Sequence, residues 1–242
     1  MFFAFLVAVV AVVAGAVAAV TGFGVGSLLT PALAVEAGTK VAVAATAIPH
    51  FVGTAQRYWM LRRHVNRRIL AGFGIASAVG GLAGALLGTR FSSRELAVVF
   101  GALLILAGIS EFTAWMHRLH WGRRAAWIAG AISGALGGLV GNQGGIRTAA
   151  MLGFDVPKES FVATATAIAL FVDGARLPVY LATQWREIFA IWPLVLTATG
   201  GVVIGTAFGT RILGWVPQRA FRQVIAVLLM ILGLYLIGAG WT

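Results

Sequence analysis

Long apolar stretches constrain this chain more than any other feature of its sequence. No Asp, Glu, Lys or Arg precedes Glu36, and apolar stretches recur along the rest of the chain. A helix needs about 20 such residues to cross a hydrocarbon core about 30 Å thick. The candidate spans are Phe3–Val20, Val41–Met60, Ile69–Thr89, Leu96–Trp115, Ala125–Val140, Pro157–Leu181, Ile188–Thr210 and Phe221–Gly240. Because none shows the strict alternation of a barrel strand, we expect an all-α polytopic membrane protein with about eight transmembrane helices.

The composition indicates that the chain is surrounded by a lipid bilayer. Hydrophobic residues make up 60% and charged residues 10% of the sequence, whereas soluble domains are typically about 25% charged. The net charge of +11 does not indicate a nucleic-acid partner, because basic residues such as Arg62, Arg63, Arg67 and Arg68 lie in short connections between spans. Such connections usually face the cytoplasm. The absence of cysteine excludes disulfides and thiolate chemistry.

The basic loops also predict how the chain crosses the membrane. The Arg62–Arg68 loop and the basic segment 116–124 favour a cytoplasmic position for both, and alternating spans then place both ends of the chain in the cytoplasm. The last loop, with Arg211, Arg219 and Arg222, would lie outside, against the same rule. No positive residue precedes the first stretch, unlike in a signal peptide, so we expect that stretch to belong to the mature fold.

Three patterns recur in the same order about 120 residues apart, which predicts an internal duplication. The recurring pairs are Gly22 and Gly26 with Gly141 and Gly145, Ala45–Ile48 with Ala165–Ile168, and Gly80-x3-Gly84-x3-Gly88-Thr89-Arg90 with Gly201-x3-Gly205-x3-Gly209-Thr210-Arg211. We predict a first four-helix membrane repeat, 1–115, a linker, 116–124, and a second repeat, 125–242. The repeats are parallel if each has four spans, and they can be inverted if the glycine-rich segment re-enters the membrane.

Glycines interrupt the apolar sequence at corresponding places in the two repeats, within Thr21–Ser27 and Val140–Gly145. Because glycine propagates a helix poorly, we expect a broken or re-entrant segment in each repeat, buried in protein. A helix that starts there directs free N–H groups and its positive dipole end at a ligand, which suits an anion. The alternative is that the glycines serve only close helix packing. The predicted substrate-binding residues are Gly24, Val25, Gly26, Ser27, Asn142, Gln143, Gly144, Gly145 and Arg147.

Four polar side chains in or beside the apolar segments carry further hypotheses. The planar fork of Arg147 suits carboxylate- or sulfonate-like oxygens, unless the side chain reaches the membrane surface instead. Asp173 and Arg176 share a helix face and predict an internal ion pair, with substrate or proton coupling by Asp173 as the alternative. His50 is either a coupling residue or a hydrogen-bonded core histidine.

The sequence contains no catalytic motif, no set of metal ligands and no nucleotide-binding loop. We therefore expect neither an enzyme nor a cofactor or metal site. Active transport by such a chain would have to be secondary, or it would have to use the ATPase of another chain.

The glycine-rich segments around Thr21–Gly26, with Pro31 after them, and Gly138–Gly145 resemble the sulfite exporter TauE/SafE family of permeases, as do the two Gly-x3-Gly-x3-Gly-Thr-Arg segments. The resemblance covers essentially the whole chain. It implies a multi-pass inner-membrane transporter of small sulfur-containing anions, such as sulfite or organosulfonates. The alternative is a non-transporting membrane scaffold or assembly component. A permease is expected to have a hydrated cavity between the two breaks and a scaffold a packed interior; a homo-oligomer is an open prediction.

Overall fold

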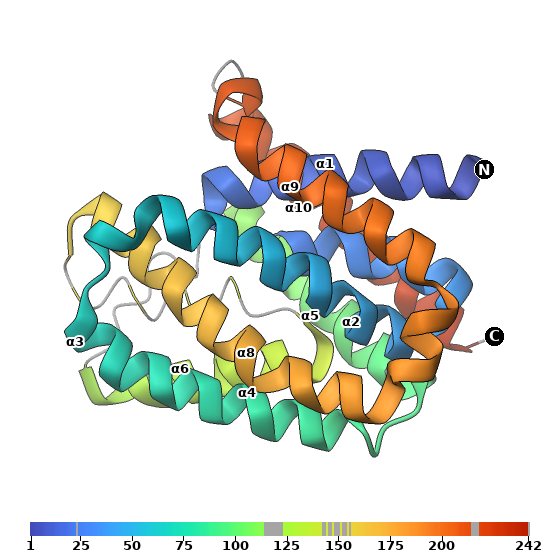
Figure 1. The fold of residues 1–242 in the computed structure, drawn as a ribbon, viewed down its shortest axis with the longest axis horizontal. Coiled ribbons are helices and arrows are strands. Elements are labelled where there is room, and N and C mark those ends of the chain that lie inside the picture. Colours follow the sequence, from blue (N-terminus) through green and yellow to red (C-terminus); the bar gives the residue numbers. More distant parts are fainter. Residues whose placement is uncertain are drawn as a thin grey trace.

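The computed structural model is a bundle of long helices that run along a roughly common direction (Figure 1). It describes residues 1–22, 24–113, 123–141, 144, 147, 151, 154, 156–213 and 218–241, and none of these lies in a β-strand. The long helices are α1 (Phe2–Thr21), α2 (Val25–Leu61), α4 (Ile75–Gly88), α5 (Ser93–Thr113), α6 (Arg123–Val140), α8 (Lys158–Ala190), α9 (Trp192–Leu213) and α10 (Gln218–Trp241). Three short turns, η1 (Arg62–His64), α3 (Arg67–Ile69) and η2 (Leu70–Gly74), join α2 to α4. The predicted all-α fold is confirmed.

The helices have the length and the surface of membrane spans. Six are long and apolar enough to cross a bilayer, and α6 and α10 add the shorter apolar stretches Ala125–Val140 and Gln223–Ala239. Large apolar side chains such as Phe5, Val79 and Leu234 are exposed on the outside of the bundle. Such a surface suits contact with lipid. These features support a multi-pass membrane protein, and the count of eight spans stays a prediction.

Two predicted spans differ in extent from the corresponding helices. The predicted span Val41–Met60 matches the part of α2 that follows Gly38, but α2 begins earlier, at Val25, directly after the first glycine-rich break. A span was also expected from Ile188, but α8 continues to Ala190 and α9 begins at Trp192. The turn falls there because Pro193 takes the second position of α9, where its missing N–H leaves no helix hydrogen bond unmade.

Helix α2 consists of two arms that meet at Gly38. The backbone at Gly38 has φ 73° and ψ 156°, a left-handed conformation that interrupts the helix. The first arm starts where Gly26 lies against Gly141, in the interior of the bundle. Just beyond Gly38, Lys40 donates from Nζ to the carbonyl oxygens of Thr89 (2.8 Å) and Phe91 (2.9 Å), past the end of α4. The second arm then runs back through the bundle to η1 (Figure 1).

The Gly-x3-Gly-x3-Gly segments hold two pairs of parallel helices together. A Cβ at Gly80 or Gly84 in α4 would overlap a backbone carbonyl oxygen of α6, and a Cβ at Gly205 in α9 would overlap the carbonyl oxygen of Val12 in α1. The contacts advance in the same direction along both helices of each pair. Helices α5 and α10 instead cross antiparallel, with Gly101 against Gly233. Small residues therefore set the spacing of the outer helices.

The two ends of the bundle carry different parts of the chain. The start of α1 and the end of α10 lie at one end, and the Arg62–Arg68 loop lies at the other, which we call the arginine-rich end (Figure 1). The prediction that places both chain ends on the same side as the Arg62–Arg68 loop is therefore wrong. The cause is the first arm of α2, which adds a pass between α1 and the second arm and so reverses the direction of the later helices.

Candidate functional site

The two glycine-rich breaks meet inside the bundle. Helix α1 ends at Gly22 and helix α6 ends at Gly141, both in the left-handed conformation with φ near 80° (81° and 77°). The N–H of Gly22 bonds the carbonyl oxygen of Ala18 at 2.9 Å, and the N–H of Gly141 bonds that of Gly137 at 3.0 Å. A Cβ at Gly26 would overlap the carbonyl oxygen of Gly141. The sequence segments singled out for a site are thus in direct contact.

The predicted residues of the first break lie at the start of α2. Gly24 is the N-cap residue and provides no side-chain cap, and Val25, Gly26 and Ser27 form a buried first turn. The first N–H groups of a helix have no partner within the helix, so these groups face the interior at the junction. In the second break, Gly144 is buried, and Asn142, Gln143 and Gly145 lie outside the described residues.

Arg147 lies in the interior, next to the first break. Its side chain is 2% exposed, and its Nη2 donates to the carbonyl oxygen of Gly22 at 3.3 Å. Its Nε and Nη1 have no hydrogen-bond partner among the residues that the structure describes. The alternative in which Arg147 reaches the membrane surface is therefore wrong. A buried guanidinium with unused donors is an unusual and costly arrangement.

A buried carboxylate forms the centre of a polar cluster, which consists of His50, Arg57, Arg147, Asp173, Arg176 and Tyr180. Asp173 of α8 is fully buried; its Oδ1 accepts from Nε of Arg176 at 3.0 Å and forms an ion pair with Nη2 of the same side chain at 2.8 Å. This is the predicted ion pair on one helix face. Its Oδ2 lies 2.6 Å from Nδ1 of His50 in the second arm of α2. His50 is thus paired with Asp173 rather than alone in the core, which no sequence spacing indicated.

Arg176 and Tyr180 also hold the end of α6. Nη1 of Arg176 donates to the carbonyl oxygen of Gly137 at 2.6 Å, and the hydroxyl of Tyr180 donates to that of Gly138. Carbonyl groups in the last turn of a helix carry partial negative charge. Arg176 therefore has an acceptor for each of its three nitrogens.

Arg57 belongs to the same cluster, and it was not among the residues singled out from the sequence. Its side chain is 4% exposed, and its Nη2 donates to Oγ1 of Thr54 at 3.1 Å. Its Nε and Nη1 have no partner within the described part of the chain. It is close enough to Asp173 and Arg147 for electrostatic interaction with both. The available signal was its position: an arginine inside the predicted span Val41–Met60 is itself a functional hint.

The cluster carries an excess of positive charge. Among the described residues, the guanidinium groups of Arg57, Arg147 and Arg176 face one carboxylate, that of Asp173, which leaves a formal charge of about +2 when His50 is neutral. The C-terminal ends of α1 and α6 contribute about −0.5 each, and the N-terminal end of α2 contributes about +0.5. A net charge of about +1.5 therefore remains among these groups. Such a site is better suited to an anion than to a cation or a neutral solute.

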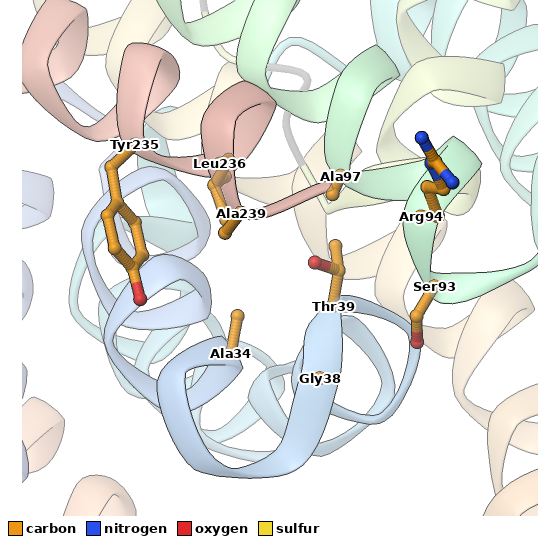
Figure 2. Close-up of a pocket in the computed structure, with 9 residues that line it drawn as sticks. All are labelled: Ala34, Gly38, Thr39, Ser93, Arg94, Ala97, Tyr235, Leu236 and Ala239. Atoms are coloured by element: carbon orange, nitrogen blue, oxygen red, sulfur yellow. The ribbon is translucent and has the colours of Figure 1, made fainter. Parts of the chain in front are cut away.

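A pocket of about 360 Å³ lies elsewhere, at the end of the bundle where α2 reverses. Figure 2 shows that it is formed by α2, α5 and α10. Its lining residues are Ala34, Gly38, Thr39, Ser93, Arg94, Ala97, Tyr235, Leu236 and Ala239. None of the cluster residues lines it. Where the two breaks meet, Gly26 lies directly against the carbonyl oxygen of Gly141.

Metal binding finds no support in the part of the chain that the structure describes, where no group of three or more His, Asp or Glu side chains comes together. The chemistry of the site is therefore that of guanidinium groups, one carboxylate, one imidazole and backbone N–H groups. Guanidinium groups and free N–H groups suit an anion, which they can hold through charge-assisted hydrogen bonds.

The chain is similar to known membrane proteins over nearly its whole length. The sequence model of the family described as sulfite exporter TauE/SafE matches residues 7–236. A curated relative, the probable membrane transporter protein y4hK of Sinorhizobium fredii (strain NBRC 101917 / NGR234), is 27% identical over 234 residues, which cover 90% of this chain and 86% of the relative. No solved structure gives a significant match. Because the family match extends over nearly the whole chain, the protein belongs to the sulfite exporter TauE/SafE family and is a membrane transporter.

Proposed function

We propose that the protein is a secondary permease that moves small sulfur-containing anions, such as sulfite or organosulfonates, across the inner membrane. The observation that carries this proposal is the excess of buried guanidinium groups over carboxylates where the two breaks meet. Guanidinium groups bind sulfonate-like oxygens through charge-assisted hydrogen bonds. The family description, which names sulfite export, supports the substrate class. The absence of a nucleotide-binding loop from the sequence supports secondary transport.

The scaffold alternative explains one observation and conflicts with another. Direct packing of Gly26 on Gly141 agrees with a packed interior. A scaffold, however, gains nothing from burying arginines without matching carboxylates, because each unpaired buried charge destabilises the fold. Arg57 and Arg147 therefore favour the permease.

Flux measurements on proteoliposomes test the proposed function. Vesicles that contain the full chain should take up labelled sulfite or small organosulfonates faster than protein-free vesicles do. Uptake should saturate with substrate concentration, because a buried site is filled once per cycle. Uptake of all these anions at the rate of protein-free vesicles would contradict the proposal.

We also propose that the two halves form an inverted repeat with eight spans, in which the first arm of α2 adds the extra pass that reverses the direction of the later helices. Helix α1 packs parallel to α9, and α4 packs parallel to α6. Helix α5 turns back from α4 through Thr89–Ser92 and crosses α10 antiparallel, so α1 runs opposite to α6 (Figure 1). In the predicted duplication, α1 of the first repeat corresponds to α6 of the second, and α4 corresponds to α9. The pair of α1 with α9 is therefore the counterpart of the pair of α6 with α4, which supports the duplication. Binding between inverted repeats is a recurrent arrangement in secondary transporters.

The charges at the two ends of the bundle support a cytoplasmic position for the arginine-rich end. The helix ends and turns there carry Arg62, Arg63, Arg67, Arg68, Arg123, Arg124, Lys158, Arg211, Arg219 and Arg222, with Glu111 and Glu159. The opposite end carries Lys40, Arg90, Arg94 and Arg186, with Glu36, Glu95 and Glu187. Basic residues near span ends favour the cytoplasmic side. The last loop, which broke this rule in the sequence-based topology, now obeys it, and the start of α1 lies outside.

Single cysteines in this cysteine-free chain test the orientation. His64 and Arg90 are exposed at opposite ends of the bundle. In intact cells, an impermeant thiol reagent should label Arg90→Cys and should leave His64→Cys unlabelled until the membrane is opened. The reverse pattern would overturn the proposed orientation and leave the anion site unaffected.

A further inference from the structure

We propose that Arg57 and Arg147 together bind the transported anion, a small oxyanion with several oxygen atoms, and that Arg176 belongs to the fixed frame around them. This inference rests on the proposed anion transport and names the groups that perform it. Arg57 comes from the second arm of α2, and Arg147 follows the break at the end of α6. The binding pair therefore joins the two halves of the chain.

The hydrogen bonds of the three arginines separate them into two kinds. Arg176 donates to Asp173 from Nε and lies against it with Nη2, and its Nη1 donates to Gly137. Its charge is matched by a carboxylate, and all its nitrogens have acceptors. Arg57 and Arg147 each use Nη2 on one neutral oxygen and leave Nε and Nη1 without a partner among the described residues. Of the three arginines, Arg57 and Arg147 are thus the two with donors available for a ligand within the described part of the chain.

The position of the pair explains why an anion belongs between them. Both side chains are more than nine-tenths buried, and the positive charge of Arg57 acts on Arg147. Neither forms an ion pair with a carboxylate among the described residues, where Asp173 binds Arg176 and His50. An anion in contact with both guanidinium groups would remove the repulsion and supply the missing acceptors. Several oxygen atoms are needed to meet donors that approach from two elements, which favours an oxyanion over a halide.

The hydrogen bond from Arg147 to Gly22 connects the site to the first break. Gly22 ends α1, and the next residues lead into the buried first turn of α2 with its uncapped N–H groups. Through Arg147, an anion would contact the second break directly and the first break indirectly. A bound anion would thus interact with both glycine-rich segments.

Titration of the purified full chain with sulfite, read as a shift in unfolding temperature, tests the pair. A ligand that binds the folded state stabilises it in proportion to ln(1 + [L]/Kd). Arg57→Gln and Arg147→Gln should each weaken sulfite binding about tenfold to a hundredfold, the usual effect of losing one charged hydrogen bond. Arg63→Gln, at an exposed arginine just beyond α2, is the matched control and should bind sulfite like the wild type.

The unfolding temperature without sulfite separates binding from a structural role. Because Arg57 and Arg147 lack a carboxylate partner, either Gln variant should unfold at or above the wild-type temperature. Arg176→Gln should unfold well below it, because it leaves Asp173 unpaired. Wild-type sulfite binding in both variants, or a loss of stability like that of Arg176→Gln, would overturn the inference. Arg57→Lys and Arg147→Lys keep the charge but lose the planar fork, so they should fold and bind sulfite at an intermediate affinity.

The two proposals fail in distinguishable ways. In one outcome, sulfate or methanesulfonate raises the unfolding temperature of the wild type but sulfite does not, and neither Gln variant shows this rise. The arginine pair is then supported as the anion site, and sulfite is not the substrate. In the other outcome, proteoliposomes transport sulfite, and both Gln variants do so at the wild-type rate and affinity. The assignment of the site to Arg57 and Arg147 is then wrong, and the proposed function stands.

Discussion

The helix pairs at the edge of the bundle and the helix crossing at its centre are built from opposite kinds of contact. At the edge, α4 meets α6 and α1 meets α9 through uncharged small residues, with Gly84 against Ala135 and Gly205 against Val12. At the centre, α2 meets α8 through ionisable side chains, with His50 against Asp173. The helices at the edge approach closely because the glycine in each contact has no Cβ. The helices at the centre approach closely because a short, charge-assisted hydrogen bond joins them.

The difference teaches which part of the molecule maintains the fold and which part performs the function. In lipid there is no hydrophobic drive between helices, so stability comes from close van der Waals contact, which small residues allow. A buried ion pair adds little net stability, because desolvation offsets the attraction. The edge pairs therefore stabilise the bundle, and the central charges are retained for their chemistry. Three substitutions sharpen this comparison, beginning with the largest expected effect.

Removal of the central carboxylate should destabilise the protein most. Asp173→Ala leaves Arg176 and His50 without their partner in a fully buried site. Breaking one side of a buried pair typically costs about 3–5 kcal/mol. The measurement is the unfolding temperature of the purified chain in detergent, with Glu187→Ala as the control, since Glu187 is exposed on the same helix. Equal unfolding temperatures for the two variants would show that Asp173 is not the anchor of the cluster.

An added methyl group at the edge should have the second largest effect. Gly84→Ala places a Cβ on the carbonyl oxygen of Ala135, so α4 and α6 have to move apart. Overpacking of this kind typically costs about 1–3 kcal/mol.

Gly200→Ala is the matched control, because nothing lies within 4 Å of a Cβ at that position of α9. There the change should be neutral or stabilising by up to about 1 kcal/mol, since alanine favours the helix. A stable Gly84→Ala variant beside a destabilised Gly200→Ala variant would contradict the role given to the edge pairs.

The sequence predicts the edge of the molecule better than its centre. Apolar stretches reveal α1, α4, α5 and α10 almost to their ends, because length and hydropathy are local properties. The spacing of Gly80, Gly84 and Gly88 also indicates a packing face. It does not indicate which helix packs there, because a periodic face carries no information about its partner.

The reversal of α2 and the central cluster were beyond local patterns for different reasons. The first arm, Val25–Ala37, is shorter than a span, and Gly38 is one of 32 glycines, so nothing marked it as a turning point. The partnership of His50 with Asp173 joins residues 123 positions apart. The spacing of Asp173 and Arg176 predicts their ion pair, whereas Arg57 was not singled out, although an arginine inside an apolar span is itself a functional hint.

The smallest of the three effects belongs to Tyr180, where the centre and the edge meet. Its hydroxyl donates to the carbonyl oxygen of Gly138, and Gly138 itself packs against the carbonyl oxygen of Gly81 in the α4–α6 pair. Tyr180→Phe removes one neutral hydrogen bond and keeps the ring, so the loss of stability should be about 0.5–1.5 kcal/mol. Tyr235→Phe, at an exposed tyrosine of α10, is the control and should leave the unfolding temperature unchanged. If Tyr180→Phe instead destabilises as much as Asp173→Ala, the hydroxyl is part of the charged cluster, and the boundary drawn between centre and edge has to move to include the end of α6.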